Sequence, residues 1–142
     1  MDEIHLPDAI EPTEWNVVFH TKTQWWWLRW VGKFKHVSAF AYVPGFRAWL
    51  VYDTQLSGTR LMLLANGDNA RATLKAYTTG CEIVTMARQG QSMGIFNRFG
   101  YYCVPSVKHL IGLKSTAILP DRLFADCLRS GQLIVKPKDA AP

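Results

Sequence analysis

Apolar and polar residues alternate over the middle of the chain in a way that predicts a β-hairpin. Residues 36–43 and 48–53 are rich in Val, Ala, Tyr and Trp, which favour strands. Pro44-Gly45-Phe46-Arg47 lies between them and is a turn signal. We therefore expect the two segments to pair antiparallel.

Shorter apolar runs predict further strands on either side of this hairpin. They lie at residues 15–20, 59–64, 74–77, 81–86 and 133–135. Turn residues separate most of them, so an antiparallel meander is expected. Residues 24–30 are dominated by Trp and fit either a helical turn or a strand, with a core position or a membrane-interface role both open.

The second half of the chain carries two helix signals. The segment 103–113 has Pro105 in its first turn and Gly112 past its last apolar position. Pro120 and Gly131 bound a second helix in the same way. Its apolar stripe predicts burial against the sheet and consists of Leu123, Phe124, Cys127 and Leu128.

These elements predict one α+β domain: an antiparallel β-sheet or meander with a Cys-bearing helix packed on it. The length of 142 residues suits a single domain with a real core. We assign residues 1–14 to an acidic N-terminal arm, 15–136 to the domain and 137–142 to a C-terminal tail.

Charge and composition narrow the functional classes. The net charge is +5, and all 16 basic residues lie between Lys22 and Lys138, so either polyanion binding or simple solubility follows. The N-terminus lacks a signal peptide, and no apolar run is long enough to span a membrane. We expect a soluble protein.

Three scattered cysteines exclude the common metal and redox motifs. Cys81, Cys103 and Cys127 form no C-x-x-C pair, which argues against zinc knuckles and thioredoxin chemistry. No metal and no cofactor is therefore expected, and free thiols fit a reducing compartment.

Cys103 is the candidate nucleophile. It lies at the predicted start of a helix, where unpaired N–H groups and the helix dipole favour a thiolate and can hold an oxyanion. His36, at the start of a hairpin strand, is the candidate base, and His20 is its competitor.

A third polar group would orient the imidazole of His36. A two-residue hairpin loop places Asp53 opposite His36, whereas a four-residue loop places Gln55 there. A carboxylate also stabilises an imidazolium, so Asp53 is the preferred partner.

The order of these residues resembles the circularly permuted members of the NlpC/P60-like papain superfamily. There, a His opens one strand, a polar residue lies on the next, and a Cys at a helix start comes later in the chain. The resemblance spans residues 25–130 and is carried by segments 35–40, 49–53 and 103–113. Ser38-Ala39 departs from the Gly-Ile that many relatives have after the His.

The chain looks most like small proteins encoded by bacteriophages and prophages. These share a Cys-x-x-x-Val-Lys-x-x-x-Gly segment, here Cys103 to Gly112, followed by a Pro-led helix. The resemblance implies a cysteine peptidase or amidase acting on peptides, including cell-wall peptides. It also implies synthesis in a host cytoplasm and association with a virion and its structural proteins.

Two other functions remain open from the sequence. The fold can be kept by a non-catalytic structural protein of a phage particle. The basic charge also fits a nucleic-acid-binding module, although no helix-turn-helix or basic helix is visible.

Overall fold

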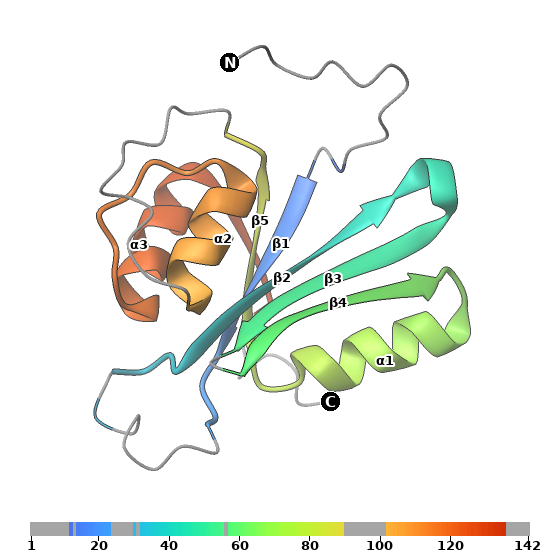
Figure 1. Ribbon diagram of the computed structural model, residues 1–142, viewed down its shortest axis with the longest axis horizontal. Coiled ribbons are helices and arrows are strands. Elements are labelled where there is room, and N and C mark those ends of the chain that lie inside the picture. The colour runs from blue at the N-terminus through green and yellow to red at the C-terminus, as the bar shows by residue number, and fades with distance from the viewer. Residues whose placement is uncertain are drawn as a thin grey trace.

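The computed structural model describes residues 12, 14–23, 30, 32–55, 57–89 and 102–135. Within them, six strands and three helices form an α+β fold (Figure 1). The strands are β1 (Glu14–His20), β2 (His36–Val43), β3 (Ala48–Gln55), β4 (Gly58–Ala65), β5 (Glu82–Ala87) and β6 (Gln132–Val135). The helices are α1 (Asp68–Thr78), α2 (Cys103–Ile111) and α3 (Pro120–Ser130).

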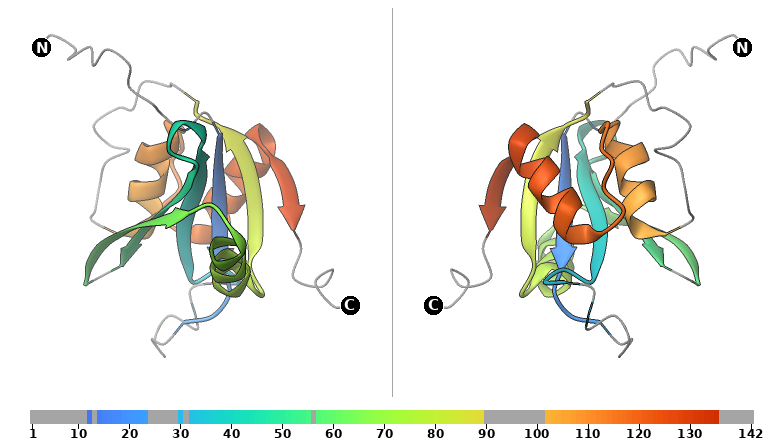
Figure 2. Two further views of the ribbon diagram at one scale, coloured as in Figure 1. Left: turned by 90° about the vertical axis from the view of Figure 1, so that its right-hand side faces the viewer. Right: turned by 90° about the vertical axis from the view of Figure 1, so that its left-hand side faces the viewer.

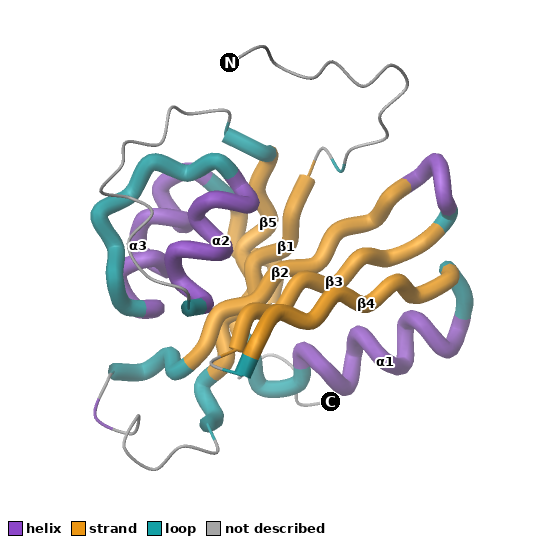
Figure 3. Tube along the Cα trace, in the orientation of Figure 1, coloured by secondary structure: helices purple, strands orange, loops and turns teal. Residues whose placement is uncertain are grey.

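All six strands belong to one sheet of order β4-β3-β2-β1-β5-β6, and every neighbouring pair is antiparallel. Strands β1 to β4 form the predicted meander. Because β4 and β5 consequently run in the same direction, a crossover must join them, and α1 supplies it (Figure 3).

The two faces of the sheet bury two apolar clusters. Helices α2 and α3 cover one face, and α1 covers the other (Figure 2). Alternate residues of each strand point to opposite faces, so Val37, Ala39 and Ala41 of β2 pack under α2 while Phe40 packs towards α1. Each face therefore has its own core.

Most predicted elements are confirmed, with one clear error. The hairpin, the strands at 15–20, 59–64, 81–86 and 133–135, and both predicted helices are present. The strand predicted at 74–77 is wrong, because these residues lie in α1. Residue Glu14, assigned to the arm, pairs with Ala87 as the first residue of β1, and residues 24–29 lie outside the described part of the chain.

The α3 stripe is buried less completely than expected. Leu123 and Cys127 are fully buried, and Phe124 is half-buried against the aromatic rings of Phe19 and Phe34. Leu128 is exposed. The helix therefore packs through three of its four apolar positions, of which two are fully covered.

Helix α3 also fixes the segment that leads into β2. The carboxylate of Asp121 accepts hydrogen bonds from the backbone N–H groups of Lys33 (2.9 Å) and Phe34 (2.7 Å). A Cβ atom at Gly32, where φ is +124°, would lie 2.3 Å from the Asp121 carboxylate. Glycine is therefore required beside this contact, which lies just before His36.

Candidate active site

Helix α2 begins at Cys103, as the sequence predicted. Tyr102 before it is extended (φ −139°, ψ −179°), and Gly112 after it closes the helix in the left-handed conformation (φ 64°, ψ 30°). Pro105 has no N–H and suits the first turn. Ser106 N–H donates to the Tyr102 carbonyl (3.3 Å), so the N–H groups of Cys103 and Val104 are those for which the helix itself provides no acceptor.

His36 is the first residue of β2, at a place where β2 and β3 separate. The two strands pair from Val43↔Ala48 to Ala39↔Tyr52, whereas β2 remains paired with β1 as far as His20↔His36. The first turn of α2 stands at this end of the sheet (Figure 1). The start of β2 and the start of α2 therefore lie at the same end of the sheet.

Asp53 and Gln55 both belong to a chain of hydrogen bonds that ends at His36. The Val43↔Ala48 pairing encloses four turn residues, the register for which Gln55 was predicted to lie opposite His36. The imidazole nevertheless bonds diagonally to Asp53, with Nε2 2.5 Å from Oδ1. Gln55 donates its amide N–H to the other carboxylate oxygen at 3.2 Å, so it holds Asp53 while Asp53 holds His36.

This arrangement makes His36 cationic at neutral pH. Burial lowers the pKa of His36, but hydrogen bonds to Asp53 and to Cys103, together with the charges of both groups, outweigh burial and raise it to about 9. Burial raises the pKa of Asp53, yet its bonds to His36 and Gln55 bring it below the usual value. His36 and Asp53 thus form a charged pair beside Cys103.

A second thiol–imidazole pair lies on the α1 side of His36. His20 is paired with His36 across the β1–β2 ladder, with ring centroids 5.3 Å apart. Its Nδ1 lies 3.3 Å from the Cys81 sulfur and its Nε2 2.8 Å from the Ser38 hydroxyl. His20, the alternative candidate base in the sequence analysis, therefore contacts a different cysteine, Cys81.

The chemistry of this second pair is different. Burial and the charge of His36 lower the pKa of His20 to about 4, and burial raises the pKa of the Cys81 thiol. Cys81 is only 5% exposed and follows the end of α1 instead of opening a helix. His20 contacts a neutral hydroxyl where His36 contacts a carboxylate, so the second pair is a neutral, buried hydrogen bond.

Tyr77 of α1 was not anticipated, because its segment was predicted as a strand. Its ring packs edge-on against His20 at 5.3 Å. Its buried hydroxyl lies beside Asp53 and Ser38 without a well-aligned hydrogen bond. The spacing Ala70, Leu74, Tyr77 was the helical signal that identifies this residue.

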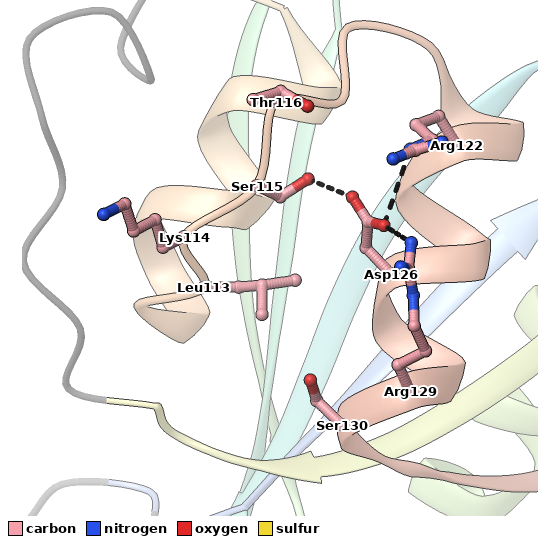
Figure 4. Close-up of a pocket in the computed structure, with 8 residues that line it drawn as sticks. All are labelled: Leu113, Lys114, Ser115, Thr116, Arg122, Asp126, Arg129 and Ser130. Atoms are coloured by element: carbon pink, nitrogen blue, oxygen red, sulfur yellow. Dashed lines mark hydrogen bonds and ion pairs between the residues drawn. The ribbon is translucent and has the colours of Figure 1, made fainter.

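A cavity beside α3 is separate from these groups. It has a volume of about 450 Å³ and is lined by the α2–α3 connection and α3 (Figure 4). Asp126 lies between Arg122 and Arg129 and accepts a hydrogen bond from the Ser115 hydroxyl at 2.5 Å. Its acid and its two arginines already satisfy one another, so we assign the candidate site to Cys103 and His36.

Comparison with protein-family models, with curated proteins and with solved structures gives no match. Among the described residues, no three His, Cys, Asp or Glu side chains gather as metal ligands would. No helix in that part of the chain is long and apolar enough to cross a membrane. The functional argument therefore depends on the geometry of the site.

Proposed function

We propose that this protein is a cysteine peptidase or amidase of permuted papain-like type, with Cys103 as nucleophile. One observation carries the proposal: the thiol at the start of α2 interacts with an imidazole that is held by a buried carboxylate. A nucleophile, a base and an orienting group in contact are the arrangement that acyl transfer needs.

The proposed reaction starts from a Cys103 thiolate beside the His36 imidazolium, the ion pair that forms when the thiol gives its proton to the imidazole. The thiolate attacks the amide carbonyl, a C–S bond forms, and the carbonyl electrons move onto oxygen, where the N–H groups at the start of α2 stabilise the charge. The His36 imidazolium then protonates the leaving nitrogen as the C–N bond breaks. Water, deprotonated by His36, hydrolyses the thioester and regenerates the thiol.

Asp53 and Gln55 are positioning residues in this scheme. Asp53 engages Nε2 of His36, which leaves Nδ1 for the thiol. Peptides, including cell-wall peptides, are the proposed substrates, and a phage-encoded, virion-associated protein made in a host cytoplasm is the biological setting we propose.

Hydrolysis of a peptide mixture and of purified cell-wall fragments, followed by mass spectrometry, tests the proposal. The wild type should release new amino termini, and Cys103→Ser should abolish release while changing the melting temperature by less than about 2 °C, since Cys103 is only half-buried. His109→Gln, at an exposed position of the same helix, is the control and should retain activity. If wild type and Cys103→Ser are equally inactive on every substrate, a non-catalytic particle protein becomes the better account, and strongly salt-dependent DNA binding would instead favour a nucleic-acid-binding module.

A further inference from the structure

Two leucines of the edge strand β4 are exposed on the face of the sheet that carries α2. Leu61 and Leu63 are each 65% exposed. They pair with Tyr52 and Leu50 of β3, and directly paired residues of an antiparallel ladder point to the same face. The four side chains therefore form one strip, which we call the β3–β4 strip.

This strip is continuous with the face that bears Cys103. Leu50, Tyr52 and Cys103 all pack against the same core cluster beneath α2. Helix α2 covers β2 and part of β3, so the strip emerges beside the helix and continues to the β4 edge. Tyr52 directly precedes Asp53 in β3, so this end of the strip lies at the same end of the sheet as Asp53, although the two side chains point to opposite faces.

Packing among the described residues does not account for the exposure of the two leucines. The opposite face of β4 packs on the α1 cluster through Met62 and Leu64. Edge strands are commonly protected by charged residues or proline, yet residues 61–65 read Leu-Met-Leu-Leu-Ala. Contiguous exposed apolar residues are a common feature of binding surfaces.

We propose that the β3–β4 strip binds apolar side chains of an extended peptide substrate whose amide bond is presented to Cys103. Leu61 and Leu63 are two residues apart on one strand, about 7 Å, which is also the spacing of alternate side chains in an extended peptide. The inference rests on the proposed function and specifies its substrate as a peptide with apolar residues near the cleaved bond.

Two thiol reagents test it. The first is an uncharged peptide with apolar residues on both sides of a central α,β-unsaturated carbonyl, which adds the Cys103 sulfur to its β-carbon and a proton to its α-carbon. A matched peptide has Asn and Ser in place of the apolar residues. The second reagent is iodoacetamide, which is too small to reach the strip. Labelling rates at Cys103 are measured by peptide mass spectrometry.

The apolar peptide should label wild-type Cys103 at least about tenfold faster than the polar peptide, the discrimination expected from one apolar contact. The double variant Leu61→Asn/Leu63→Asn should lose most of that preference but keep its iodoacetamide rate. Phe46→Asn, which alters a residue 68% exposed at the far end of the hairpin, should change neither.

An unchanged preference in the double variant would overturn the inference and leave the proposed function intact. A dimer that the double variant dissociates, with no change in preference, would identify a second copy of the chain as the occupant and would also overturn it. The alternative is that a thiol reagent with a plain alkyl chain labels Cys103 faster than the apolar peptide does. That result would indicate that the strip binds lipid and would overturn the inference. If Cys103 reacts with neither reagent, the proposed function itself fails.

Discussion

At the scale of single residues, the two paired histidines His20 and His36 have opposite charge states. His36 donates a hydrogen bond to the Asp53 carboxylate and interacts with Cys103, whereas His20 is bonded to a serine and a buried thiol. We predict that imidazole resonances in NMR titrations will show the pKa of His36 near 9 and that of His20 near 4. Equal values near 6.5 would show that neither environment is as described.

These shifts link stability to pH in a definite direction. Because the pKa of folded His36 is raised to about 9, its contribution is fully present below the unfolded value of 6.5 and is lost as pH rises through 9. The loss of stability in His36→Gln should therefore shrink by on the order of 1–3 kcal/mol between pH 6 and pH 10 in urea unfolding. Thr73→Ala, at an exposed position of α1 with no titratable side chain, should show no such trend.

His20 acts in the other direction. Its pKa is lowered to about 4 in the folded protein, so the unfolded chain binds the proton more readily between pH 4 and 6.5, and stability falls as pH falls through that window.

Lys108 explains one part of the Cys-x-x-x-Val-Lys segment in physical terms. It is 3% exposed, and its ammonium donates to the carbonyl groups of Ser115 (3.0 Å) and Ala117 (2.7 Å). We predict that Lys108→Met costs about 1–3 kcal/mol of unfolding free energy, because two buried carbonyls lose their donor. Lys75→Met, at an exposed position of α1, should change it by less than about 0.5 kcal/mol, and similar costs for the two variants would refute this role.

At the scale of elements, the helices and the hairpin with strong local sequence signals were predicted correctly, whereas α1, whose signal is weak, was not. The hairpin and both Pro-initiated helices carry turn and capping residues in the sequence itself. Helix α1 has neither a proline in its first turn nor a glycine at its C-cap and buries only Ala70 and Leu74, so its apolar run at 74–77 resembled a strand. The need for a crossover between β4 and β5 arises only from the sheet order, which no local pattern reveals.

The contribution to stability of the contact between α3 and the segment before β2 can be tested by mutating Asp121. Asp121→Ala leaves the N–H groups of Lys33 and Phe34 without their acceptor. We predict a loss of about 1–3 kcal/mol in urea unfolding. Asp68→Ala, which removes an exposed carboxylate from the first turn of α1, is the control and should cost less. Equal effects would mean that the contact adds nothing beyond a generic helix charge.

At the scale of the whole molecule, the site is assembled from segments far apart in the chain. The sequence identified Cys103, His36, Asp53 and Gln55 because each is marked locally by a helix start or by the hairpin register. It did not identify Cys81, Ser38 or Tyr77, because their contact with His20 depends on α1 folding across the sheet. The basic charge of the chain, by contrast, has no described contact that assigns it a ligand.

The presence of two thiol–imidazole pairs gives the molecule an internal control. Cys103 is half-buried beside a His36 whose pKa is raised to about 9, whereas Cys81 is buried beside a His20 whose pKa is lowered to about 4. A mechanism that needed only a cysteine near a histidine would not distinguish them. The proposed mechanism does, because it depends on the helix start and on Asp53.

The most direct measurement is the rate of iodoacetamide alkylation at each cysteine between pH 5 and pH 9, followed by peptide mass spectrometry. Cys103 should be the thiol that reacts, it should still react at mildly acidic pH, and His36→Gln should slow it at least about tenfold at pH 6 while His20→Gln leaves it nearly unchanged. Labelling of Cys81 in preference to Cys103, or an unaltered Cys103 rate in His36→Gln, would contradict the account.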